Sequence, residues 1–353
     1  MLSLTSNPLL VAAISLAVAA PLLLAWWWRH KTKSGWLSAL RPLAAVLACQ
    51  VLAISALFLW VNNQYGFYTS WSDLFGVRTE QSTIQTNALA RPGAGRLEVL
   101  TVPGRAARDH AGKILVWLPP EYGQPRFRTA NFPVLMVLPG QPSTPEAMFR
   151  HYDFGEVAST LMNAGRIKPF IAVFPPLMTN PPRDTECTNI RGGPQAYTWL
   201  SSMVPNAVHH QLRAQPGPWS LAGWSTGAFC GAKLMLTQPK NFQSAVSFGG
   251  YFTPIIDRTT GDLFHGDAAA RQRNSPLWLY QHHGLHGRKI LLICGRQDKG
   301  SWKANQQMLA ASRGDRGVSF LDFTTGGHNY RNYRHYLPDA LQWLDHVHMV
   351  QGH

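Results

Sequence analysis

Short apolar runs alternate with longer segments of helical spacing from Leu97 onward, and this alternation limits the fold class more than any other feature. Short apolar runs are typical of buried strands, and helices between them supply the crossovers that parallel strands require. The pattern therefore predicts an α/β domain with a mainly parallel central sheet and helices on both faces. Strands are predicted at Leu97–Val102, Lys113–Leu118, Phe132–Leu138, Phe170–Phe174, Trp219–Ala222, Ala245–Phe252, Lys289–Cys294 and Val318–Phe323, the first two as a pair. Helices are predicted at Thr144–Ala164, Ala196–Arg213, Ser225–Gln238 and Tyr333–His346.

Two uncharged apolar runs precede this domain, at Pro8–Trp28 and Pro42–Val61. Each has about 20 residues, which is long enough to cross a bilayer core. Buried core helices are one alternative, and a cleaved signal peptide is another for the first run. A signal peptide has positive charge before its apolar run, but Met1–Asn7 carries no charge. We therefore expect two transmembrane helices.

The basic residues lie between the two runs, in the segment 29–33 and at Arg41. Under the positive-inside rule this loop stays in the cytoplasm, and everything after the second run lies outside. The sequence thus predicts a multi-pass membrane anchor over residues 1–62, a juxtamembrane linker over 63–96 and an extracellular or periplasmic domain over 97–353.

The chain is basic, with 32 Lys and Arg against 18 Asp and Glu and a net charge of +14. This excess suits either an ordinary charged surface or attraction to anionic lipid head groups and acidic wall polymers. The sequence has no dense basic block with interleaved aromatic residues, so we expect no nucleic-acid partner.

A G-x-S-x-G pentapeptide, Gly223 to Gly227, follows the predicted strand Trp219–Ala222 and opens a predicted helix. A strand, a sharp turn at serine and a helix make up the nucleophile elbow of α/β-hydrolases. Because the bare pattern is more often a simple turn, its meaning depends on the residues that follow other strands. The elbow makes Ser225 the candidate nucleophile.

A serine nucleophile needs a histidine base and an acid that orients the histidine. In α/β-hydrolases both come after the serine, the acid first. Asp298 follows the strand Lys289–Cys294, and His328 follows the last predicted strand. The carboxyl ends of parallel strands meet at one edge of the sheet, so the order predicts a Ser225–His328–Asp298 triad. Asp298 as a helix cap and His328 as a surface residue are the alternatives, with Asp257, Asp262, His282, His283, His286 and His335 as rival acids and bases.

The oxyanion of acyl transfer needs two backbone N–H donors. One is expected from Thr226, directly after the nucleophile, and the other from the loop after Phe132–Leu138, near Gly140 and Gln141. This loop reads LPGQP, whereas many lipases have HGGG there.

Four cysteines are present, of which Cys49 lies in the second apolar run and Cys294 in a strand-like run. Cys187 and Cys230 remain, and they could pair in an oxidising compartment, although spacing does not establish the pair. No C-x-x-C motif occurs, so we expect no cysteine zinc site, and we assign no metal and no cofactor.

The segments VLMVLPG, GWSTG, CGRQD and GGHNYRNYRHYLPDALQWL resemble the putative-esterase branch of the α/β-hydrolases over about residues 97–347. This branch includes esterase D-like enzymes, enterochelin and feruloyl esterases, and mycobacterial mycolyltransferases. The DTECT segment and the elbow helix with Cys230 look like membrane-anchored actinobacterial members. The resemblance implies the triad roles of Ser225, Asp298 and His328, and makes Gln141 the preferred second oxyanion donor. Two apolar runs replace the cleaved signal of secreted mycolyltransferases, so mycolyl transfer does not follow.

These features predict a membrane-anchored serine esterase or acyltransferase that forms an acyl-enzyme on Ser225. The tether beside the bilayer favours an acyl ester of the cell envelope, a lipid or an acylated glycan. The alternative is a catalytically silent envelope-binding domain with the same fold. A channel or transporter is not expected, because the apolar runs contain no ionisable residues that would line a pathway.

Overall fold

A computed structural model describes residues 6–29, 36–65, 95–102, 112–177, 179, 183–324 and 326–349. The chain divides into two compact units, residues 1–81 and 82–353. Most of the linker predicted over residues 63–96 lies outside the described residues.

The first unit contains two long helices, α1 (Asn7–Arg29) and α2 (Trp36–Tyr65), which pack against each other. Their apolar stretches have mean hydropathies of 2.4 and 2.3, and by length and composition both are candidate membrane spans. Large apolar side chains such as Leu22 and Ile54 are about two-thirds exposed (65% and 67%), a surface that suits a lipid environment. The helix α2 begins before the predicted span at Pro42, because a helix can continue beyond the apolar stretch that marks the bilayer core.

The second unit is built on an eight-stranded sheet in the order β1-β2-β4-β3-β5-β6-β7-β8. The strands are β1 (Arg96–Thr101), β2 (Lys113–Leu118), β3 (Val134–Leu138), β4 (Ile171–Phe174), β5 (Trp219–Trp224), β6 (Phe242–Phe248), β7 (Lys289–Gly295) and β8 (Val318–Phe323). The strand β2 is antiparallel to β1 and β4, and every other neighbouring pair is parallel. The mainly parallel sheet predicted from the sequence is therefore confirmed.

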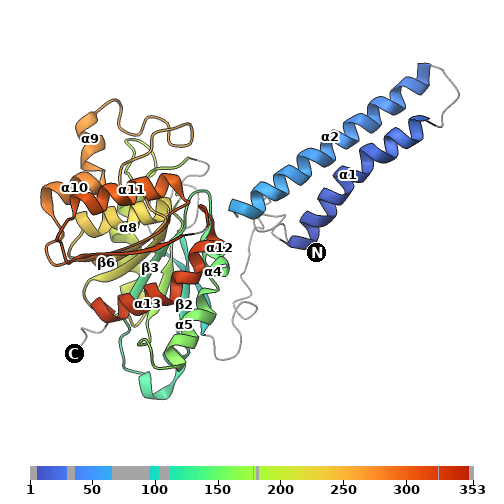
Figure 1. Cartoon of the computed structure of the whole chain (residues 1–353). Coiled ribbons are helices and arrows are strands. Elements are labelled where there is room, and N and C mark those ends of the chain that lie inside the picture. The colour runs from blue at the N-terminus through green and yellow to red at the C-terminus, as the bar shows by residue number, and fades with distance from the viewer. Residues whose placement is uncertain are drawn as a thin grey trace. The chain divides into compact units, whose positions relative to one another are not determined.

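Helices cover both faces of this sheet, as Figure 1 shows for the second unit. One face carries α7 (Val204–Gln211), α8 (Thr226–Thr237), α10 (Pro276–His283) and α11 (Lys299–Ala311). The other carries α4 (Pro145–His151), α5 (Phe154–Asn163), α12 (Tyr330–Tyr333) and α13 (Leu337–Leu344). In β3, Met136 belongs to the core on the first face and its neighbours Leu135 and Val137 to the core on the second. The strand is buried on both sides, which explains its continuous apolar sequence.

Several helices and strands end at other residues than predicted, because one residue adopts a left-handed backbone conformation there. The helix predicted over Thr144–Ala164 is two helices, because Asp153 adopts a left-handed conformation (φ 47°) between α4 and α5. The strand predicted over Ala245–Phe252 ends at Phe248, because Gly249 (φ 57°) turns the chain out of the sheet. The other short elements of the described residues are η1 (Pro120–Gly123), η2 (Pro125–Phe127), α6 (Ala196–Thr198), η3 (Trp199–Met203), α9 (Ala268–Arg273), η4 (Arg334–Tyr336) and η5 (Asp345–Met349).

Candidate active site

Ser225 occupies a sharp turn between β5 and α8, with φ 53° and ψ −114°. A side chain at Gly223 would overlap the backbone of Gly227, and one at Gly227 would overlap the backbone of Leu138 in β3. Both glycines are therefore needed for the helix to approach the sheet so closely. This strained strand–turn–helix geometry is that of a nucleophile elbow.

The structure brings the three predicted triad residues together. The Nε2 atom of His328 lies 3.0 Å from Ser225 Oγ, and its Nδ1 atom lies 2.6 Å from Asp298 Oδ2. Asp298 also caps α11, since its Oδ1 atom accepts a hydrogen bond from the Ser301 backbone at 3.4 Å. One oxygen of Asp298 thus caps the helix and the other contacts His328, so the two arrangements considered from the sequence occur together.

Tyr333 was not predicted from the sequence as a site residue, but it forms a hydrogen bond with Asp298. Its hydroxyl donates a hydrogen bond of 2.6 Å to Asp298 Oδ2, and the side chain is fully buried. Burial opposes ionisation of Asp298, but the hydrogen bonds from His328 and Tyr333 hold the pKa of its carboxyl group below the usual value. A tyrosine five residues after the histidine, on the following helix, was the only signal in the sequence for this contact.

Replacing Tyr333 by phenylalanine should lower kcat/KM for a simple ester about tenfold, because a buried carboxylate loses a hydrogen-bond donor. The loss should also raise the pKa of Asp298 towards its usual value of 3.8. A carboxyl group with a lowered pKa stabilises the fold above its unfolded pKa and loses that contribution as pH falls through the folded pKa. The acid limb of unfolding should therefore move to higher pH in the variant. Tyr336→Phe, which alters a half-buried neighbour, is the control, and equal activity in both variants would contradict the assignment.

Trp224 packs beneath the histidine and does not line the cavity beside Ser225. Its ring stacks on His328 with 4.3 Å between centroids and an interplanar angle of 28°, and it also contacts Tyr330 and Tyr333. A side chain at Gly140 would overlap this ring, so the glycine of the LPGQP loop is required by the packing.

Three of the rival acids and bases make other contacts. His282 Nδ1 pairs with the Trp278 carbonyl at 2.8 Å, and Asp262 accepts a hydrogen bond from the backbone of Phe264 at 3.1 Å. Asp257 borders the cavity, but its Oδ1 atom is held by both the N–H and the hydroxyl of Thr259 at 2.7 Å. The structure brings none of these three to His328 or Ser225 in the part of the chain that it describes.

A cavity of about 490 Å³ opens beside Ser225 and is bordered by both predicted oxyanion residues, Gln141 and Thr226. Thr226 is the first residue of α8, and the first N–H groups of a helix have no acceptor within it. The described residues contain no cluster of three or more His, Cys, Asp or Glu side chains that could hold a metal ion.

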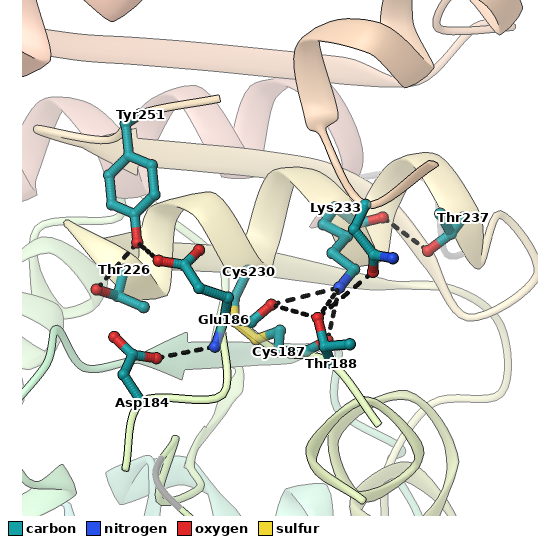
Figure 2. The surroundings of a disulfide bond; sticks show 10 residues. Asp184, Glu186, Cys187, Thr188, Thr226, Cys230, Lys233, Thr237 and Tyr251 are labelled. Atoms are coloured by element: carbon teal, nitrogen blue, oxygen red, sulfur yellow. Dashed lines mark hydrogen bonds between the residues drawn. A yellow bond between two sulfur atoms is a disulfide. The ribbon is translucent and has the colours of Figure 1, made fainter. Parts of the chain in front are cut away.

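Cys187 and Cys230 form a disulfide with their Cα atoms 5.7 Å apart, whereas Cys294 is a buried free thiol. The bridge joins the loop before α6 to the elbow helix α8 (Figure 2). It therefore fixes the loop that carries Glu186, which lines the cavity, to the helix that follows Ser225.

Removing this bridge should destabilise the second unit, because the disulfide closes a long loop with a sequence separation of 43. A Cys187→Ser, Cys230→Ser double variant is expected to lose about 2–4 kcal/mol and roughly 5–10 °C of Tm. Thermal unfolding with and without reductant measures this loss, and the double variant should not respond to reductant. A wild type that is equally insensitive would show that the bridge contributes nothing.

The sheet, the serine elbow and the Ser–His–Asp hydrogen bonds define an α/β-hydrolase fold. The chain belongs to the Putative esterase family, whose model matches residues 106–344, so the resemblance noted in the sequence is confirmed. The family model describes esterases.

Three similar proteins are 17–24% identical to this chain. An uncharacterized protein of Corynebacterium glutamicum is 24% identical over 247 residues, 65% of this chain and 55% of that protein. The chain thus spans about half the length of this curated relative. The structure of an S-formylglutathione hydrolase from Agrobacterium tumefaciens has a TM-score of 0.62 at 17% identity and covers 73% of this chain and 97% of that one. The fluorophosphonate-binding serine hydrolase FphF of Staphylococcus aureus has a TM-score of 0.59 at 20% identity, with coverages of 73% and 99%.

Proposed function

We propose that the chain is a serine esterase or acyltransferase in which Ser225, His328 and Asp298 form the catalytic triad. The unbroken hydrogen-bond chain from Ser225 Oγ through His328 to Asp298 carries this proposal. His328 takes the serine proton as Oγ attacks the ester carbonyl, and the Asp298 carboxylate stabilises the imidazolium. Backbone N–H groups of Gln141 and Thr226 hold the oxyanion, and the alcohol leaves with the proton from His328. Water or a second alcohol then releases the acyl group.

We further propose that α1 and α2 anchor the chain in a membrane, with the catalytic unit on the extracellular or periplasmic side. The basic residues between the two apolar stretches support this orientation, and a disulfide is typical of an oxidising compartment. An enzyme tethered there meets acyl esters of the cell envelope, so an envelope lipid or an acylated glycan is the proposed substrate class.

Incubation of the full-length protein with envelope lipid extracts tests this function. Mass spectrometry should detect either free acid or new acyl esters with the wild type, and neither with Ser225→Ala. Digestion of the catalytic unit by protease added to intact spheroplasts tests the orientation. A wild type that leaves both the extracts and simple esters unchanged would favour the alternative of a silent envelope-binding domain.

A further inference from the structure

One wall of the cavity beside Ser225 is polar and acidic, and the triad does not use it. This wall comprises Asp184, Glu186, Tyr251, Asp257, Thr259 and Thr260. Among the described lining residues, Ile255 is the only aliphatic side chain, and none is Lys or Arg. Because the wall holds three acidic residues and no Lys or Arg, an uncharged group that carries hydroxyls fits it better than an anion.

Glu186 is the most deeply buried acid of this wall, with a relative exposure of 1%. Figure 2 shows its carboxyl group facing Tyr251, whose hydroxyl donates a hydrogen bond of 2.6 Å to Oε1. The Oε2 atom is buried and makes no hydrogen bond with the residues that the structure describes, although the Ile255 N–H lies near the carboxyl group. A buried oxygen without a partner is costly, which points to a ligand as the missing partner.

The loop that carries Glu186 is held in a strained conformation by several contacts. Glu186 and Cys187 both have left-handed backbones, with φ 47° and φ 50°. The buried Lys233 Nζ donates to the carbonyl of Cys187 at 2.7 Å and to Thr188 Oγ1 at 3.1 Å, and the disulfide adds a covalent link. The Glu186 N–H is also bound by Asp184 Oδ1 at 2.9 Å. Strain that the surroundings maintain in this way is typical of functional sites.

The charge state of Glu186 favours an uncharged ligand. Burial, together with the nearby Asp184, raises the pKa of its carboxyl group to about 8, although the Tyr251 hydrogen bond and the Lys233 ammonium group act in the opposite direction. At neutral pH the group is therefore mostly a neutral acid, which can donate a hydrogen bond. The Tyr251 hydroxyl also lies 3.3 Å from Oγ1 of Thr226, so a ligand bound at Glu186 lies beside the oxyanion position.

We propose that Glu186 and Tyr251 form a binding subsite for an uncharged polyol or sugar, which serves as the alcohol of the ester or as the acyl acceptor. This inference rests on the proposed function. In acyl transfer, one acceptor hydroxyl oxygen bonds to the acyl carbon and passes its proton to His328 Nε2. The bond from the acyl carbon to Ser225 Oγ breaks, and His328 returns the proton to Oγ. A second hydroxyl of the acceptor binds Glu186 and orients the first.

Partition of an acyl-enzyme between water and added alcohols tests this subsite. With p-nitrophenyl butyrate as donor, the leaving group needs no polyol subsite, so kcat/KM reports acylation alone. The wild type should transfer butyrate to glycerol in clear preference to 1-propanol. Glu186→Met should lower this glycerol preference about tenfold and change kcat/KM less than about threefold. Glu186→Gln, which keeps a donor and an acceptor, should retain most of the preference.

Several results would overturn the inference. These are a wild type without preference for glycerol, a folded Glu186→Met variant that keeps the preference, or a variant in which acylation falls as much as transfer. If Glu186→Met does not fold, Tyr251→Phe takes its place and should lower the preference at least about threefold. An unchanged preference in that variant overturns the inference as well. A wild type that does not hydrolyse the donor at all would instead refute the proposed function.

Discussion

Replacing Ser225 by alanine should abolish labelling by a fluorophosphonate probe and lower hydrolysis of simple esters by about 10³–10⁶-fold. The alanine variant keeps the elbow backbone but lacks the Oγ atom that lies 3.0 Å from His328 Nε2. Without a nucleophile no acyl-enzyme forms, and only the oxyanion donors and substrate binding contribute to the remaining rate. The measurements are probe labelling, steady-state hydrolysis of p-nitrophenyl butyrate and intact-mass detection of a butyryl adduct.

Ser202→Ala is the matched control, because this serine lies on η3 and its hydroxyl donates to the Thr198 carbonyl at 3.0 Å. The control should keep wild-type labelling and turnover. Labelling of a folded Ser225→Ala variant at the wild-type rate would show that another residue is the nucleophile, and the proposed mechanism would then be wrong.

Much of the fold could be predicted because buried strands leave a strong pattern in the sequence. The run Ile290–Cys294 is apolar throughout since β7 is covered on both faces, and its position required no knowledge of tertiary contacts. The predicted boundaries of helices and strands were wrong where the conformation of one residue ends an element, as that of Asp153 does between α4 and α5. Hydrophobic periodicity averages over several residues, so it does not detect a single left-handed residue.

The positions of the candidate site residues were predictable because Ser225, Asp298 and His328 each follow a parallel strand at the same edge of the sheet. Tyr333 and Glu186 were not predictable in this way. Their contacts depend on how α12 folds back over β7 and on how the loop before α6 is fixed to α8. Such contacts between distant segments are determined by tertiary packing and have no local periodicity.

Asp298 links stability to the proposed catalysis, since its two oxygens have different partners. One oxygen caps α11 through Ser301, and the other accepts hydrogen bonds from His328 and Tyr333. A substitution that retains the shape of the side chain can therefore keep the helix cap and still change the tautomer of His328 and the stabilisation of its charged form. Asparagine is such a substitution, because its amide oxygen can accept the cap hydrogen bond.

Replacing Asp298 by asparagine should lower kcat for ester hydrolysis about 10⁴-fold and change thermal stability far less than activity. The amide group bears no charge to stabilise the imidazolium, and where its NH₂ group faces Nδ1 it favours the wrong tautomer of His328. Single-turnover acylation with p-nitrophenyl butyrate measures the effect at the chemical step. Asp262→Asn is the control, because the Asp262 carboxylate accepts a hydrogen bond from the Phe264 backbone and lies outside the lining of the cavity. Loss of activity in the Asp262 variant with full activity in the Asp298 variant would assign the acid role to Asp262, and equal activity in both would show that His328 needs no carboxylate.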